Sequence, residues 1–331
     1  MASFSNLPVE LRQIIIQHVL HGRRESPSTP SRSNRVPLED SGLITERWQR
    51  GGCGVYYEAS NKQFSTNCLP LLLTNRQISA ETKSVLDLLE TDYVLDISVL
   101  NDLDLFLTWI TVPRLTHRIN HLRTEVRLFG HVIPTTAARC QGGDGGSTGI
   151  EFAFHQVLQR FLMDGPVGQK KGGNNDGYKN RNISVRTLEL DFTSSEEGFP
   201  FPPDEFHWRD YLLQLRGRGK LDEWKTEGIN AKGLPIWVSI PKYKTRPEWM
   251  ARWVCLQISR IVRCSDFYGV RYGSMIYENV GTVRVSVDGT PMEDLDLSHC
   301  PESAVARREE LGFSFIRPNI ARHESEEEES G

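Results

Sequence analysis

The sequence has few of the features that identify disulfide-stapled, metal-binding or membrane-spanning proteins. Its six cysteines include no C-x-x-C pair, and a chain of 331 residues can form an apolar core without disulfides. No segment approaches the roughly 20 consecutive apolar residues of a membrane helix. The N-terminal segment also lacks the basic leader and apolar run of a signal peptide. We therefore expect a reduced compartment, the cytoplasm or the nucleus, and no membrane partner.

A large excess of charge of one sign is also missing. The formal net charge is −4, from 39 basic and 43 acidic residues. Five of the acidic residues lie between Glu324 and Glu329, so the rest of the chain is nearly neutral. Surfaces that bind nucleic acid usually cluster positive charge. We therefore expect no nucleic-acid partner.

No group of residues has the spacing of a known catalytic or metal-binding motif. The glycine-rich segment at 142–149 has no lysine followed by serine or threonine, which a phosphate-binding P-loop requires. His117 and His121 are four residues apart but lack the glutamate of the H-E-x-x-H zinc motif. The adjacent His299 and Cys300 have no third group that would orient a catalytic pair. We therefore predict no cofactor, no metal site and no catalytic residue.

What the chain does contain is two apolar N-terminal segments separated by a polar one. We predict a first helix within residues 1–21, a mobile polar insertion over 22–66, a main folded unit over 67–317 and a disordered acidic tail over 318–331. The insertion includes a run of serine, threonine and proline from Ser26 to Ser31, which cannot bury apolar area. The tail is predicted to be disordered because its charges repel one another.

Beyond Leu89 the apolar pattern alternates between the periods of strands and helices. Strands are predicted at 93–97, 122–128, 185–192 and 283–287, and an edge strand at 236–240, which lies between two prolines. Helices are predicted at 103–110, 154–162, 206–215 and 245–262, the last opened by a capping box of Thr245 and Glu248. This alternation favours helices packed on a sheet with parallel neighbours. The fold class is therefore α/β (or α+β), an irregular domain with the N-terminal helices packed at one end.

The first apolar segment, residues 6–20, predicts an amphipathic helix. Pro8 suits a first helical turn because its missing N–H has no partner there, and Glu10 meets the positive end of the helix dipole. The apolar residues follow helical spacing and are Leu7, Leu11, Ile14, Ile15, Ile16, Val19 and Leu20. An isolated helix of this length is marginal in water. It must therefore pack against its own domain or against another protein.

A second helix is predicted from Pro70 to Leu89, with a partly polar stripe that includes Asn75 and Thr82. Its run Leu71-Leu72-Leu73-Thr74-Asn75-Arg76-Gln77-Ile78-Ser79-Ala80-Glu81-Thr82 follows a helix that opens with Leu7-Pro8-Val9-Glu10-Leu11-Arg12. In these segments the chain resembles a family of uncharacterised filamentous-fungal proteins with an F-box-like N-terminus.

The resemblance implies a protein-binding module, the substrate-recognition subunit of a cullin-RING ubiquitin ligase. The residues that would contact a Skp-type adaptor are Leu7, Pro8, Leu11, Ile14 and Ile15, and the following domain would bind a target protein that the sequence does not identify. Two alternatives stay open. The first helix could be buried against the second in the protein's own core, with no ligase role, or the chain could be an enzyme of unrecognised type.

Overall fold

The computed structural model describes most of the chain. The described residues are 4–38, 54–58, 66–131, 149–166, 183–195, 198–204, 207, 226–229, 235–238, 243–264, 267–297 and 302–312. Several predicted features lie outside this set: residues 142–148 of the glycine-rich segment, nearly all of the helix at 206–215, His299, Cys300 and the acidic tail at 318–331.

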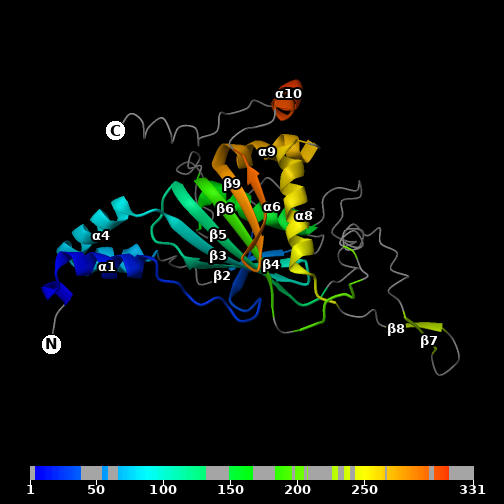
Figure 1. Ribbon diagram of the computed structural model, residues 1–331, viewed down its shortest axis with the longest axis horizontal. Coiled ribbons are helices and arrows are strands. Elements are labelled where there is room, and N and C mark those ends of the chain that lie inside the picture. The colour runs from blue at the N-terminus through cyan, green and yellow to red at the C-terminus, as the bar shows by residue number, and fades with distance from the viewer. Residues whose placement is uncertain are drawn as a thin grey trace.

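The described elements form a mixed α/β fold around one 8-stranded sheet in the order β1-β2-β4-β3-β5-β6-β9-β10 (Figure 1). The strands are β1 (Arg35–Pro37), β2 (Gly54–Glu58), β3 (Asp92–Leu100), β4 (Asp104–Thr111), β5 (Arg118–Phe129), β6 (Ser184–Ser194), β9 (Val280–Val287) and β10 (Thr290–Asp296). A separate antiparallel pair joins β7 (Thr226–Ile229) to β8 (Pro235–Val238), so β8 overlaps the predicted edge strand but lies outside the main sheet.

The centre of the sheet is parallel, as the alternation of strands and helices predicts. Strands β3, β5, β6 and β9 pair in parallel, whereas β1–β2, β3–β4 and β9–β10 are antiparallel. Leu122 of β5 lies beside Leu188 of β6, and Val126 lies beside Phe192. The apolar residues that alternate in the sequence therefore form continuous rows across one face of the sheet.

Three helices pack on this apolar face (Figure 1). Helix α6 (Gly149–Asp164) contacts β2 and β4, while α8 (Pro247–Val262) and α9 (Phe267–Asn279) contact β6 and β9. A short helix, α10 (Glu302–Glu310), packs on α9. The main core lies between these helices and the sheet, with Trp253 and Phe192 among its fully buried side chains.

The N-terminal helices form a second, smaller layer beyond the end of the sheet, at the left of Figure 1. They are the 3-10 turn η1 (Phe4–Asn6), α1 (Val9–Leu20), α3 (Cys68–Thr74) and α4 (Arg76–Leu88). The single helix predicted from Pro70 to Leu89 is thus two helices. Asn75 separates them with an extended backbone, and its side-chain oxygen accepts a hydrogen bond from the N–H of Ile78 at 2.9 Å. Asparagine caps a new helix here because it satisfies a free N–H.

The helix predicted at 103–110 is wrong, because this segment is strand β4. Residues Asn101 and Asp102 both have a φ of 56° and turn the chain directly from β3 into β4. Every residue of β4 is buried, so its sequence shows no alternation that would distinguish a strand from a helix.

The predicted capping box of α8 is also wrong. The Thr245 hydroxyl donates to the Asp102 carboxylate, and α8 has no side-chain cap.

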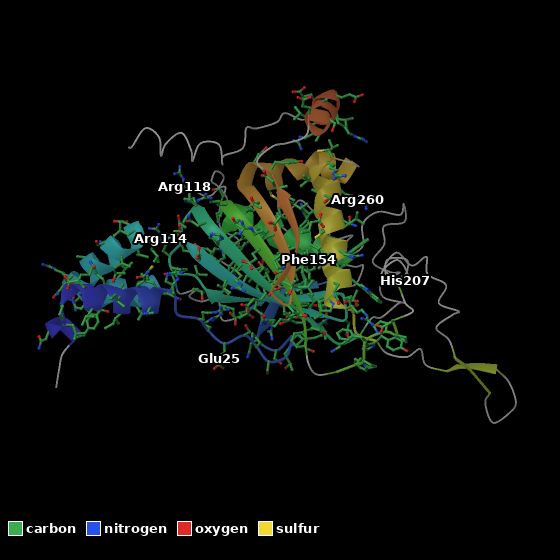
Figure 2. The ribbon with its side chains drawn as sticks, viewed as in Figure 1. Glu25, Arg114, Arg118, Phe154, His207 and Arg260 are labelled. Atoms are coloured by element: carbon green, nitrogen blue, oxygen red, sulfur yellow. The ribbon has the colours of Figure 1, made fainter. Side chains whose placement is uncertain are left out.

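The prediction of a mobile insertion over 22–66 is wrong for residues 22–38 and 54–58. Residues 54–58 form β2, which pairs with β1 and β4 and buries Val55 and Tyr57. Residues 22–37, which we call the strap, run along the sheet and end in β1 (Figure 1). Figure 2 labels Glu25 on this segment.

Arginines hold the strap on the sheet face opposite to the helices. Arg23 pairs with Glu125 of β5 at 2.5 Å, Arg32 pairs with Asp104 of β4 at 2.6 Å, and the Arg24 Nε donates to the Trp109 carbonyl at 2.9 Å. The strap was expected to be mobile because it has too little apolar area to be held by burial. Charge pairing and hydrogen bonds to the sheet hold it instead. Its partners are distant in sequence, so no local pattern revealed them.

A buried ion pair lies beneath the strap. The Asp96 side chain of β3 is 0% exposed and accepts hydrogen bonds from the guanidinium of Arg127 on β5, one at 2.9 Å, and from the Ser98 hydroxyl at 3.1 Å. The same guanidinium donates to the carbonyl of Pro27 in the strap at 2.7 Å. Burial outweighs these bonds and raises the pKa of Asp96. The pair therefore joins two sheet strands to the strap.

Replacing Arg127 with methionine would leave the Asp96 carboxylate buried without its cation. Breaking a buried pair costs about 3–5 kcal/mol, and we expect the free energy of unfolding at pH 7, measured in urea by tryptophan fluorescence, to fall by that order. A carboxyl group with a raised folded-state pKa stabilises the fold when protonated and loses this effect as the pH rises. The deficit should therefore shrink as the pH falls towards the ordinary aspartate pKa of about 3.9.

Arg123→Met is the matched control for this experiment. Arg123 lies four residues before Arg127 on the same strand and therefore on the same face, but its side chain is 46% exposed and lies 4.0 Å from Glu189. We expect a change within about 0.5 kcal/mol. Equal losses in the two variants would contradict the special role of the Asp96–Arg127 pair.

Candidate functional site

Among the described residues, helix α1 packs on the rest of the protein through one side. Its inward ridge consists of Arg12, Ile16 and Leu20, which repeat every four residues and therefore lie on one face. Ile16 and Leu20 are buried in a small apolar cluster with Cys68 of α3 and Leu86 of α4. This cluster is separate from the main core of the sheet. The inward ridge thus supplies the packing that a short helix needs to be stable.

An ion pair lies at the N-terminal end of the inward ridge. The guanidinium of Arg12 donates to both carboxylate oxygens of Glu81 on α4, with Nε–Oε2 and Nη2–Oε1 distances of 2.9 and 2.6 Å. Gln77 donates to the same carboxylate at 3.1 Å. The Arg12 hydrogen bonds lower the pKa of Glu81. Arg12 and Glu81 are 69 residues apart, and the sequence did not predict that they meet.

The outward ridge of α1 lies beside the inward one and is apolar. Leu11 is 47% exposed, Ile14 is 50% exposed and Ile15 is 39% exposed. Pro8, which was predicted in the first helical turn, is instead the exposed N-cap of the helix, and Leu7 is partly buried. The five predicted contact residues are therefore brought together along one end and one side of α1.

Helix α3 extends the apolar character of this region. It contacts α1, and two of its leucines, Leu69 and Leu73, are exposed. Large exposed apolar side chains scattered singly are ordinary, whereas several of them on two contacting helices make this region a candidate for binding. We call the exposed residues Leu11, Ile14, Ile15, Leu69 and Leu73, together with Leu7 and Pro8, the N-terminal apolar surface.

Hydrogen bonds join the N-terminal helices to the sheet where α1 passes into the strap and where α3 begins. The Asn67 amide donates to the carbonyls of Leu20 and Gly22, each at 2.8 Å. The Arg24 N–H donates to the Ile110 carbonyl of β4 at 3.0 Å, and the Asn67 N–H donates to the Val112 carbonyl at 2.9 Å. These hydrogen bonds connect the N-terminal helices to the edge of the α/β domain at β4 and the segment that follows it.

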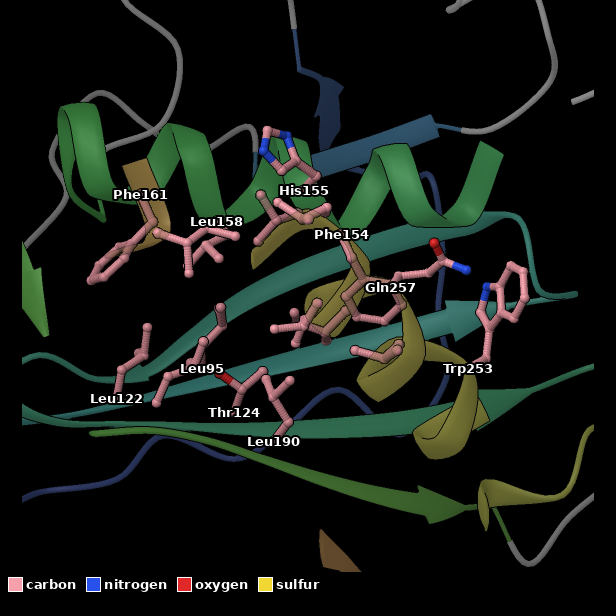
Figure 3. A pocket seen from close by; sticks show the side chains of 17 residues that line it. Leu95, Leu122, Thr124, Phe154, His155, Leu158, Phe161, Leu190, Trp253 and Gln257 are labelled. Atoms are coloured by element: carbon pink, nitrogen blue, oxygen red, sulfur yellow. The ribbon is translucent and has the colours of Figure 1, made fainter. Parts of the chain in front are cut away.

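A second candidate site is an apolar cavity of about 80 Å³ between the sheet and helices α6, α8 and α9 (Figure 3). His155 lines it, and burial lowers the pKa of this imidazole to about 4, so His155 is neutral at pH 7. Thr124 of β5 and Gln257 of α8 are its other polar residues. The lining contains no aspartate, glutamate, lysine, arginine or cysteine.

The described residues contain no group of three or more His, Cys, Asp or Glu side chains that could hold a metal ion. None of the helices in the described part is long and apolar enough to cross a membrane. The chain matches no protein-family model, and neither a curated protein nor a solved structure is significantly similar to it.

The contribution of the Arg12–Glu81 pair to stability should depend on pH. Because the pKa of Glu81 is lowered in the folded protein, its ionised form stabilises the fold above the ordinary glutamate pKa of about 4.3 and loses this effect as the pH falls through the lowered value. We expect Glu81→Gln to lower the urea midpoint at pH 7, and the difference from the unsubstituted protein to narrow below pH 4. Glu90→Gln, an exposed site just after α4, should show neither effect. A Glu81→Gln deficit that is constant with pH would contradict the charge pair.

Proposed function

We propose that this protein is an F-box-like protein-binding module, and that it acts as a substrate-recognition subunit of a cullin-RING ubiquitin ligase. The N-terminal apolar surface would dock a Skp-type adaptor, and the α/β domain would bind the target protein. In this proposal the chain is not an enzyme, because ubiquitin transfer takes place on other subunits. The proposed location is the cytoplasm or the nucleus, where such ligases work.

The exposure of the outward ridge of α1 is the observation that carries this proposal. Leu11, Ile14 and Ile15 are spaced as an amphipathic helix presents anchors to the groove of a partner. The alternative is that the helix is buried in the protein's own core. Of the apolar residues of α1, only Ile16 and Leu20 are buried in this way. The helix is thus divided between an intramolecular face and a face that is free to bind.

The fixed join between the N-terminal helices and the sheet also supports the proposal. A subunit that bridges an adaptor and a target is effective when it holds them at a constant separation, since a rigid linkage avoids an entropic cost of assembly. The hydrogen bonds of Asn67 and Arg24 supply such a linkage.

The test is co-purification of a Skp-type adaptor with the full chain. We expect Leu11→Asp combined with Ile15→Asp to reduce adaptor recovery at least ten-fold, because a buried unpaired carboxylate is costly at an apolar interface. Both positions are exposed in the free protein, and so the circular dichroism spectrum and the melting temperature should stay close to those of the unsubstituted chain.

Two further variants make the result specific. Leu311→Asp changes a leucine of similar exposure that follows α10, which packs on α9 at the top of Figure 1, away from α1, and it should leave recovery unchanged. Ile16→Asp changes the inward ridge and should melt the N-terminal helices. Unchanged adaptor recovery with the Leu11 and Ile15 double variant would refute the proposed docking surface.

A further inference from the structure

The strap contains two of the three places in the chain where a serine or threonine directly precedes a proline. These are Ser26-Pro27 and Thr29-Pro30, and the third is Thr290-Pro291 at the start of β10. A proline restricts the residue before it to an extended backbone. Proline-directed protein kinases phosphorylate serine or threonine in this context, so the structure around each pair decides which hydroxyl group such an enzyme can reach.

Thr29 lies on a part of the strap that hydrogen bonds do not hold to the sheet. Its side chain is exposed, and among the described residues no hydrogen bond joins residues 28–30 to the sheet. The strap is held on either side of them, at the Pro27 carbonyl and at the Arg32 guanidinium. Residues 28–30 therefore form a short bridge between two attachments, and they can enter the active site of a kinase while the sheet stays intact.

The other two pairs are less accessible. Ser26 is half-buried, and the carbonyl of the next residue, Pro27, accepts a hydrogen bond from Arg127 at 2.7 Å. Thr290 is exposed but lies opposite Val287 in the antiparallel pairing of β10 with β9. A protein kinase binds several residues on each side of its acceptor, and β10 would have to leave the sheet to provide them. The structure therefore favours Thr29 over both.

The strap is basic, and the surface beneath it supplies the matching acidic groups. Residues 22–37 include four arginines and one glutamate, a net charge of +3. Three of the arginines form ion pairs with carboxylates of β2, β4 and β5, and the pairs are Arg24–Glu58, Arg32–Asp104 and Arg23–Glu125. A phosphate group adds about −1.5 to −2 and would leave the strap at roughly +1. The attraction between strap and sheet would fall accordingly.

The pair that a phosphate group on Thr29 would disturb first is Arg32–Asp104. Arg32 follows Thr29 by three residues and donates to the Asp104 Oδ2 at 2.6 Å. Asp104 is 8% exposed, and its Oδ1 has no hydrogen-bond partner among the residues that the structure describes. Arginine binds phosphate through two parallel hydrogen bonds, so the new group would compete for the guanidinium and would also repel the carboxylate.

We propose that Thr29 is a phosphorylation site for a proline-directed protein kinase, and that its phosphate group loosens the strap from the sheet. The Thr29 Oγ1 attacks the γ-phosphorus of ATP and forms a new O–P bond. The bond from that phosphorus to the β–γ bridging oxygen breaks, ADP leaves, and the hydroxyl proton passes to a carboxylate of the kinase. This inference does not depend on the proposed adaptor docking, because it concerns only the strap and the sheet.

The first test is to incubate the full chain with a cyclin-dependent kinase, ATP and Mg²⁺ and to locate the phosphate by mass spectrometry of peptides. We expect phosphate on Thr29. Thr29→Val keeps the shape of the side chain and should abolish incorporation, whereas the matched variant Thr290→Val should leave it unchanged. An absence of incorporation into the unsubstituted chain overturns the proposal, and so does incorporation that persists in Thr29→Val.

The second test measures the effect of the phosphate on the strap. Amide hydrogen exchange of residues 22–37 should become about two- to five-fold faster in the phosphorylated chain, because about one ion pair of the exposed type is lost. Exchange of β5 and β6 should stay the same. Thr29→Val treated with kinase in the same way is the control, and its exchange should match that of the untreated chain.

Salt separates an effect of charge from one of bulk. Raising the ionic strength to about 1 M shortens the screening length to about 3 Å, and the difference in exchange between the phosphorylated and unphosphorylated chains should shrink. The proposed loosening is overturned if phosphorylation of Thr29 leaves exchange of the strap unchanged or makes it slower. A difference that is the same at low and high salt also overturns it, since the effect would then not come from charge.

Discussion

A sheet that carries helices on one face must satisfy the charges of its other face by other means. Among the described elements α6, α8 and α9 cover the apolar face, and the opposite face carries the buried Asp96. The Arg127 guanidinium neutralises this carboxylate and donates to the Pro27 carbonyl of the strap. Charge pairing thus orders a serine- and proline-rich segment that has too little apolar area to order itself.

The position of the N-terminal helices follows from this pairing. The strap begins just after the end of α1. The residues that bind the strap to the sheet therefore also determine where the C-terminal end of α1 lies relative to the sheet. A small apolar cluster and the Arg12–Glu81 pair then hold α1 by its inward ridge. Since these contacts suffice, the outward ridge need not be buried within the chain, and its exposure is compatible with stability.

Particular elements show where sequence patterns succeeded and where they failed. Strands β5 and β6 were predicted because one of their faces is apolar and the other polar, and they pair in register. Strand β4 was taken for a helix because it is buried on both faces and has no alternation. Strand β10 was not predicted, although the Asp288-Gly289 turn before it, with φ values of 49° and 73°, is a strong hairpin signal.

The sequence by itself determined the α/β class, the parallel centre of the sheet and the amphipathic character of α1, because these depend on periods of a few residues. Only the tertiary structure decided which ridge of α1 is covered, that the strap is bound, and that Gln257 lines a cavity. Arg12 and Glu81 are 69 residues apart, and Arg23 and Glu125 are 102 residues apart. Such pairs depend on which surfaces the fold brings together, and local periodicity contains no information about them.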